Sequence, residues 1–309
     1  MSKPTLDELF ERRLTYPDFE PRERLARLVG LEDQKERLSK ILGLLIHQKG
    51  FNQWLAKHHP EAGALGNLVR SRPPLVVLAG DVGSGKTELA ETIGDSVARQ
   101  EDIEITLFPL SLSSRGQGRV GEMTQLISSA FDYTIEVATK LKSSTGKARG
   151  GVLLLVDEAD ALAQSREAAQ MHHEDRAGVN AFIRGIDRLG NGALPAAVIM
   201  CTNRLNALDP AIRRRAAEVL MFGRPTDLQR ATVLRNLLAA VGFTTHDVKE
   251  LVHATGPTKE RPYGFTYSDI TQRLLPTIVL DAYPSKALSS KRALEIAKYI
   301  EPTPPFKDE

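Results

Sequence analysis

Residues 80–87 read Gly-Asp-Val-Gly-Ser-Gly-Lys-Thr, and residues 75–79 before them form the apolar run Leu-Val-Val-Leu-Ala. A G-x-x-x-x-G-K-[ST] pattern after a buried strand is typical of a loop that holds the phosphates of a nucleoside triphosphate. Its glycines let backbone N–H groups turn inward around a phosphate, because a Cβ would obstruct the approach. A helix expected at 88–98 would direct its positive N-terminus at the anion. The stretch therefore predicts nucleotide binding.

The positions of this loop have different roles in holding the nucleotide. Lys86 is predicted to reach the β- and γ-phosphates, and the hydroxyl of Thr87 is predicted to bind Mg²⁺. We expect ATP and Mg²⁺ as the ligands. The predicted nucleotide-contacting residues of the loop are Gly80, Asp81, Val82, Gly83, Ser84, Gly85, Lys86, Thr87 and Glu88.

The composition is that of an ordinary globular protein. Of the 309 residues, 41% are hydrophobic, enough for a sizeable core. The 41 lysines and arginines nearly balance the 39 aspartates and glutamates, so no overall field favours nucleic acid or an anionic membrane. The single cysteine, Cys201, suits a reducing compartment, and no apolar run approaches the ~18 residues of a membrane span. We therefore expect a cytoplasmic protein without a membrane or nucleic-acid partner.

Apolar periodicity divides the chain into three parts. Residues 1–24 are charged and interrupted by prolines, so we expect an N-terminal arm there. Between residues 25 and 224, apolar strands alternate with helical stretches, which indicates a parallel sheet flanked by helices. Residues 225–309 are helical only and predict a small α-helical domain, the lid. The predicted fold class is thus α/β with a phosphate loop, followed by a helical lid. The expected strands are 75–79, 105–110, 152–156 and 197–202.

Two carboxylates end the third of these strands. Asp157 and Glu158 follow the run at 152–156, and open parallel sheets bind their ligands beside the carboxyl ends of strands. We predict that Asp157 takes part in holding Mg²⁺ and that Glu158 acts as general base on the attacking water. Asn203, at the end of the next strand, is a weaker candidate to hold that water. The pattern predicts hydrolysis of the nucleotide.

Three adjacent arginines follow in the stretch 208–215, Leu-Asp-Pro-Ala-Ile-Arg-Arg-Arg. Neighbouring guanidinium groups repel one another unless nearby anions offset their positive charges. A positive charge delivered to the γ-phosphate in the transition state raises a rate by about 10³ or more. The alternative is a solvated basic turn or a salt bridge.

The order of the phosphate loop, the Asp-Glu strand, the arginine stretch and the helical lid resembles the AAA+ ATPases over roughly residues 25–300. The resemblance implies that Arg214 and Arg215 reach the nucleotide of the next subunit in a ring, usually a homo-hexamer. It also implies that Val29 and Gly30 contact the adenine.

A narrower resemblance exists to the pachytene-checkpoint ATPases, the thyroid-receptor-interactor type, in residues 126–131, 176–187 and 264–276. These proteins remodel HORMA-domain proteins by unfolding their terminal segments, and bacterial relatives accompany HORMA proteins in antiphage signalling. The resemblance implies that Arg119 and Val120 contact the substrate in the ring's channel. Arg119 stands where threading relatives carry an aromatic residue, so threading and mere loosening of the substrate both stay open.

The lid position at which checkpoint relatives carry a nucleotide-sensing arginine corresponds to Ser268, with Arg273 the nearest alternative.

Four other functions use the same phosphate loop: a nucleic-acid motor or loader, a generic AAA+ chaperone, a small-molecule kinase and a nucleotide switch. Balanced charge disfavours the nucleic-acid motor. The kinase needs no arginine cluster acting between subunits, and an intact Glu158 disfavours the switch.

Overall fold

The computed structural model describes residues 9–112, 122–142, 148–162 and 173–306. Within this part of the chain, one sheet runs in the order β1-β3-β4-β5-β2-β6. Every strand pair is parallel except β1 with β3. The α/β fold class predicted from the sequence is confirmed. The strands are β1 (Leu14–Tyr16), β2 (Leu75–Gly80), β3 (Glu104–Ser111), β4 (Gly150–Asp157), β5 (Ala196–Thr202) and β6 (Glu218–Phe222).

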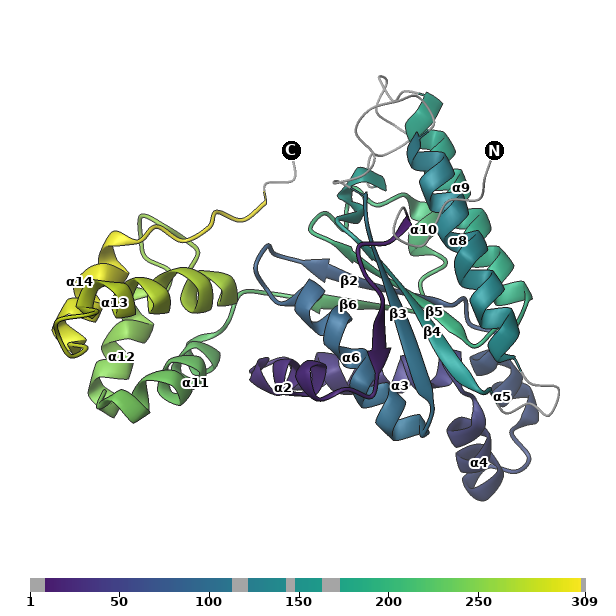
Figure 1. Cartoon of the computed structure of the whole chain (residues 1–309), viewed down its shortest axis with the longest axis horizontal. Helices are drawn as coiled ribbons and strands as arrows, with labels where there is room; N and C mark the ends of the chain where they lie inside the picture. Colours follow the sequence, from purple (N-terminus) through teal and green to yellow (C-terminus); the bar gives the residue numbers. More distant parts are fainter. Residues whose placement is uncertain (1–8, 113–121, 143–147, 163–172, 307–309) are drawn as a thin grey trace.

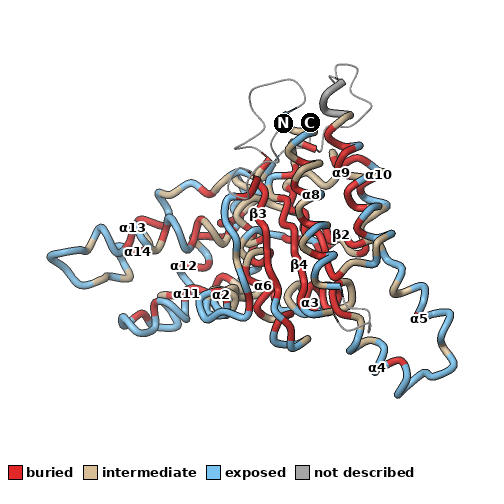
Figure 2. The backbone as a smooth tube through the Cα atoms, turned by 45° about the vertical axis from the view of Figure 1, so that its right-hand side comes forward, coloured by how far each residue is buried: buried red, intermediate tan, exposed pale blue. Residues whose placement is uncertain are grey.

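Both faces of the sheet are buried, as the continuous apolar strands require. Side chains alternate along a strand, so Val76 and Leu78 pack into one core and Leu75 and Val77 into the other. Figure 2 shows the strands as the most deeply buried part of the molecule. The first core is covered by α2 (Phe19–Arg27), α3 (Glu32–Ile46) and α6 (Lys86–Glu101), and the second by α8 (Glu122–Leu141), η1 (Ala159–Leu162), α9 (His173–Asn191) and α10 (Pro210–Arg213).

The expected N-terminal arm is wrong for its described part, residues 9–24. Tyr16 is completely buried and pairs with Ile105 in the register of β1 on β3. Phe10 stacks on Phe108 with ring centroids 5.0 Å apart. These residues belong to the sheet and its core because their apolar side chains fill the edge beside β3. Helices α4 (Lys49–His58) and α5 (Gly63–Arg70) extend from the side of the sheet that is away from the C-terminal helices (Figure 1).

The lid has a hydrophobic core of its own, with Leu234 and Phe265 at its centre. It stands beside the sheet and is joined to it by the short segment after β6 (Figure 1). Thr226 and Gln229 form a capping box that starts its first helix. The elements of the lid are α11 (Asp227–Leu238), the 3₁₀ turn η2 (Ala239–Val241), α12 (Thr245–Ala254), the π-helical turn η3 (Asp269–Leu274), α13 (Leu275–Ala282) and α14 (Ser290–Tyr299).

A buried carboxylate in the lid holds the chain after α14. Asp269 is 1% exposed. Thr303 donates to it from its backbone nitrogen at 3.1 Å and from its hydroxyl at 2.7 Å. Burial alone would raise the pKa of Asp269, but hydrogen bonds from Thr266 and Thr303 outweigh burial and lower this pKa.

Replacing Thr303 with valine is expected to lower the free energy of unfolding by about 1–3 kcal/mol, because a buried carboxylate loses a hydroxyl donor. Denaturant unfolding measures the change. Thr303→Ser keeps the hydroxyl and serves as the matched control. Equal stability of the valine and serine variants would contradict the role given to this contact.

Candidate functional site

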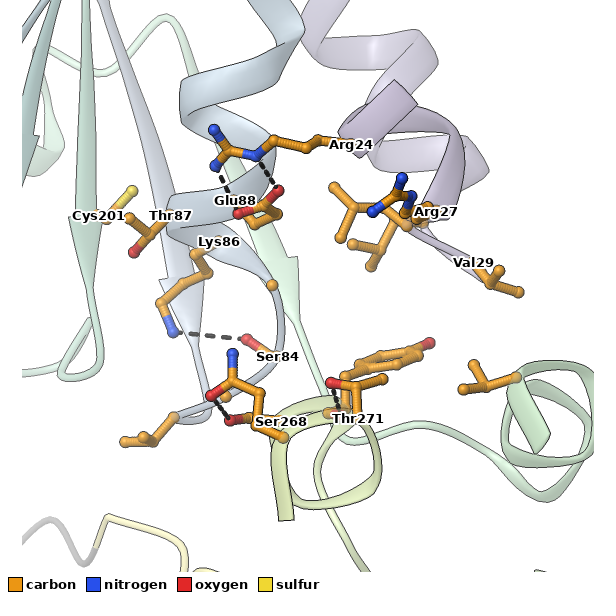
Figure 3. Close-up of a pocket in the computed structure, with 18 of the residues that line it drawn as sticks. Arg24, Arg27, Val29, Ser84, Lys86, Thr87, Glu88, Cys201, Ser268 and Thr271 are labelled. Carbon is orange, nitrogen blue, oxygen red and sulfur yellow. Dashed lines mark hydrogen bonds and ion pairs between the residues drawn. The ribbon is translucent and has the colours of Figure 1, made fainter. Parts of the chain in front are cut away.

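A cavity of about 890 Å³ lies between the phosphate loop, the segment after α2 and the lid. In Figure 3, Ser84 and Lys86 of the loop face Ser268 and Thr271 of the lid. Its lining combines polar groups with apolar side chains, a combination that suits the phosphates and the base of a nucleotide. The polar or loop residues of the lining include Gly83, Ser84, Gly85, Lys86, Thr87, Glu88, Asp157, Glu158 and Asn203, and its apolar and aromatic side chains include Leu28, Val29, Leu31, Val233, Leu237 and Tyr267.

Two glycines of the phosphate loop are required by neighbouring backbone and lid atoms. A Cβ on Gly80 would lie 1.9 Å from the carbonyl oxygen of Phe222 in β6. A Cβ on Gly83 would lie 2.8 Å from the hydroxyl of Thr266 in the lid. Both glycines also have positive φ angles, +142° and +67°. The glycine spacing thus serves the packing of the loop in addition to the phosphate approach expected from the sequence.

The ammonium of Lys86 is buried inside the loop. Its Nζ donates to the carbonyl oxygens of Gly80 at 2.9 Å and of Asp81 at 2.7 Å. Burial lowers the pKa of Lys86, and neighbouring acidic groups oppose only part of this shift. Phosphate oxygens are stronger acceptors than carbonyls, so the loop holds this ammonium ready to exchange its partners for a nucleotide.

Thr87 and Asp157 lie together between α6 and β4, where a hydrogen bond joins their side chains. Burial raises the pKa of Asp157, and hydrogen bonds from the Glu158 backbone and Thr87 oppose the shift. A hydroxyl next to a carboxylate is a set of hard oxygen donors that fits Mg²⁺. Glu158 follows with φ +51°, and its carboxylate accepts a hydrogen bond of 3.1 Å from Ser111 at the end of β3.

Asn203 is oriented by an aspartate that the sequence analysis missed. Asp160 in η1 accepts from the backbone nitrogen of Asn203 at 2.9 Å and from its side-chain amide at 3.0 Å. The hydroxyl of Thr202 donates to the same carboxylate. The signal available in the sequence was the position of Asp160, one short turn after Asp157 and Glu158.

Replacing Asp160 with alanine is expected to lower kcat by about tenfold, because the Asn203 amide loses the acceptor that aims it. Steady-state ATPase assays at saturating ATP measure the change. Asp160→Asn retains one side-chain acceptor and should lie between the alanine variant and the wild type. An unchanged kcat in the alanine variant would exclude a positioning role for Asp160.

Glu88, predicted to contact the nucleotide, lines the cavity but is already bound to an arginine of α2 (Figure 3). Nε and Nη2 of Arg24 donate to its two carboxylate oxygens at 2.7 and 2.8 Å. Arg24 Nη2 also reaches Glu91 at 2.9 Å. The hydrogen bond to Glu88 is the main cause of a raised pKa of Arg24. Arg24 and Arg27 add positive charge to the cavity, and the sequence analysis identified neither.

Arg214 and Arg215 are not among the residues that line this cavity. Arg214 is exposed. Arg215 is bound by Asp187 of α9, with Nε to Oδ1 at 2.7 Å and Nη2 to Oδ2 at 2.9 Å. The two arginines are thus in different environments, and among the described residues Arg215 has a salt bridge, one of the alternatives considered for this stretch.

The remaining predicted residues fall into two groups. Ser268 lines the cavity, whereas Arg273 binds Asp269 at 2.9 Å and is absent from the lining. Arg119 and Val120 lie outside the described residues.

In the part of the chain that the structure describes, no helix is both long and apolar enough to cross a membrane.

Proteins of known family resemble this chain from end to end. A family model described as "ATPase family associated with various cellular activities (AAA)" matches residues 76–224. CD-NTase-associated protein 6 of Escherichia coli strain MS 115-1 is 68% identical over 306 residues, 99% of this chain and 98% of the relative. The protein of the same name from strain KTE188 is 38% identical over 309 residues, all of both chains.

Solved structures are similar in sequence and in fold. A chain of the E. coli MS115-1 HORMA:CdnC:Trip13 complex is 66% identical with a TM-score of 0.91, covering 99% of this chain and 100% of that one. Rhizobiales Trip13 is 56% identical with a TM-score of 0.75, covering 96% and 100%. Together with the phosphate loop and the strand ends beside it, these likenesses show that the chain belongs to the AAA ATPase family, in its bacterial Trip13-like branch.

Proposed function

We propose that this protein is a ring-forming ATPase that uses hydrolysis to remodel a HORMA-domain protein in a bacterial antiphage signalling system. The observation that carries the proposal is one cavity that is lined by the phosphate loop after β2, by Asp157 and Glu158 at the end of β4, and by Asn203 after β5. Similarity over the whole chain to a member of a HORMA:CdnC:Trip13 complex supports the substrate class.

The contacts of the cavity residues support a role for each in hydrolysis. Lys86 binds the β- and γ-phosphates, while Thr87 and Asp157 would hold Mg²⁺, whose charge neutralises the phosphates during transfer. Glu158 orients the attacking water and accepts its proton, with Ser111 holding the carboxylate. Asn203, aimed by Asp160, holds the same water through its amide.

A complete site in this proposal needs two subunits. Arg214 is exposed and outside the cavity of its own chain, so it is available to a neighbour's γ-phosphate. This arrangement supports a ring, and the family resemblance supports a homo-hexamer as the form of that ring. Arg119 and Val120 would contact the protein substrate in the channel, and Val29 and Gly30 the adenine.

The substrate is tested by a pull-down with Glu158→Gln, which should bind ATP without hydrolysing it. The variant, incubated with ATP and nuclease-treated lysate of the source cells, is expected to recover a HORMA-domain protein. Lys86→Ala, which should not bind ATP, is the matched control and should recover none. Equal recovery by both variants, or an ATP-dependent capture of nucleic acid from untreated lysate alone, would overturn the proposal.

A further inference from the structure

A single arginine connects the phosphate loop to the lid. Arg224 lies between β6 and α11, and its side chain is 13% exposed. Its Nε donates to Asp81 Oδ2 at 2.5 Å, and its Nη1 donates to the carbonyl oxygen of Gly264 at 2.6 Å. Its guanidinium also packs over the ring of Tyr263, 5.0 Å from the centroid. One planar group therefore bonds two parts of the molecule that lie far apart in sequence.

On the loop side, Asp81 links this arginine to the phosphate-binding lysine. The other oxygen of the Asp81 carboxylate, Oδ1, accepts from the backbone nitrogen of Val82 at 2.9 Å. The backbone carbonyl of Asp81 accepts from Lys86 Nζ at 2.7 Å. Its backbone nitrogen donates to Phe222 at 3.1 Å. A displacement of Asp81 would therefore move the turn that carries Lys86.

On the lid side, Gly264 belongs to a segment anchored in the lid core. The next residue, Phe265, is completely buried, and its backbone nitrogen donates to Thr255 of the lid at 2.9 Å. Four residues beyond Gly264, the backbone nitrogen of Ser268 donates to the carbonyl oxygen of Gly83 at 3.2 Å. The segment that Arg224 binds is thus the part of the lid that touches the phosphate loop directly.

The contact requires an arginine. Its two acceptors lie in different directions, and a guanidinium offers separate donors in a fixed plane, whereas an ammonium is a single point charge. Charge-assisted hydrogen bonds of this kind are about twice as strong as neutral ones. Arg224 Nη2 is buried without a hydrogen-bond partner among the described residues.

We propose that Arg224 is a positioning residue that couples the state of the phosphate loop to the orientation of the lid. The inference rests on nucleotide binding at this loop, which is part of the proposed function. When Asp81 shifts as Lys86 exchanges its carbonyl partners for phosphate, Arg224 transmits the shift to Gly264. Loss of Arg224 would leave the residues that hydrolyse the nucleotide in place, but the orientation of the lid would no longer follow the state of the phosphate loop.

The test measures lid orientation separately from hydrolysis. Cysteines at exposed Lys140 and Lys249 carry spin labels on the sheet domain and the lid, and the native Cys201 is 1% exposed and slow to label. Distance distributions are recorded without nucleotide and with saturating ADP. Affinity for a fluorescent ADP, kcat and KM are measured on the same full-length proteins.

Three variants divide the contact into its parts: Arg224→Ala, Arg224→Lys and Asp81→Asn. In Arg224→Ala we expect a broader distance distribution that ADP no longer shifts, and about a tenfold weaker affinity for ADP. KM for ATP should rise while kcat changes less than threefold. Arg224→Lys retains the positive charge but should restore little of the ADP-dependent distance shift or of the affinity for ADP. Arg37→Ala, which removes an exposed ion pair to Glu218 on the same sheet edge, is the matched control and should behave as the wild type.

The double variant Arg224→Ala with Asp81→Asn should be no worse than the more affected single variant, because both remove one interaction. Additive effects, full rescue by lysine, or an ADP-dependent distance shift that survives in Arg224→Ala would each overturn the coupling. If the variant unfolds, as judged by its melting temperature, the lysine and asparagine variants decide the question. The distance distributions and the affinity for ADP require neither hydrolysis nor a HORMA protein, so the coupling and the remodelling function can fail independently.

Discussion

Glutamine in place of Glu158 is expected to lower the ATP turnover by about 10²–10⁴-fold, the contribution of a positioned general base. The amide keeps the shape and the hydrogen bond to Ser111 but cannot take the proton of the attacking water. Nucleotide affinity should stay within about threefold of the wild type, because Lys86 and Thr87 are the residues proposed to bind the phosphates and Mg²⁺, and both are unchanged. Steady-state ATPase assays and titration with a fluorescent nucleotide measure the two quantities.

The comparison variant is Glu88→Gln, which removes a carboxylate charge from the same cavity. Because Glu88 is engaged by two nitrogens of Arg24, its loss should loosen α2 from α6 and affect KM more than kcat. An effect on kcat as large as that of Glu158→Gln would show that cavity charge, rather than proton transfer, limits the rate. Wild-type turnover in Glu158→Gln would contradict the proposed role of Glu158 as general base.

Alanine in place of Arg214 is expected to lower turnover by about 10³-fold, the order of effect of an arginine supplied between subunits. The monomer should remain folded, because the side chain is exposed. Arg215→Ala also breaks the salt bridge to Asp187, so a loss of stability should accompany its loss of activity. The ATPase rate per subunit and the melting temperature separate the two arginines.

A mixing experiment decides whether Arg214 acts on its own chain or on a neighbour. Arg214→Ala and Glu158→Gln subunits are each nearly inactive alone. In a mixed ring, an Arg214→Ala subunit keeps Glu158 and receives Arg214 from its Glu158→Gln neighbour, so activity should reappear. Mixtures that stay as inactive as their parts would show that each site uses its own Arg214, against the ring arrangement.

Much of the fold, and several polar residues that line the cavity, were predictable because they depend on local pattern. Continuous apolar runs predicted β2, β3, β4 and β5 within one or two residues of their observed ends. The lid helices followed from their helical spacing, although a π-helical turn at Asp269–Leu274 divides one of them. Strands β1 and β6 were missed: β1 has three residues and β6 five, too few for alternation to be distinguished from a loop.

Other residues were missed because their partners are remote. Asp160 is 43 residues from Asn203, and Arg24 is 64 residues from Glu88. Arg24 is an ordinary charged residue in its own neighbourhood, and the position of Asp160 just after Asp157 and Glu158 does not by itself reveal its contact with Asn203. The cavity that gives these side chains a role exists only after α2, the strand ends and the lid have packed.

The sequence alone determined that this chain binds a nucleoside triphosphate on a parallel α/β sheet, because a loop of eight residues after a buried strand carries the required donors within itself. Only the tertiary structure decided how that loop is connected to the rest of the molecule. Arg224 and Asp81 are 143 residues apart, and their contact depends on β6 packing beside β2 and on the lid folding back over the loop. Such a contact forms only when whole elements pack together, so no local sequence pattern predicts it.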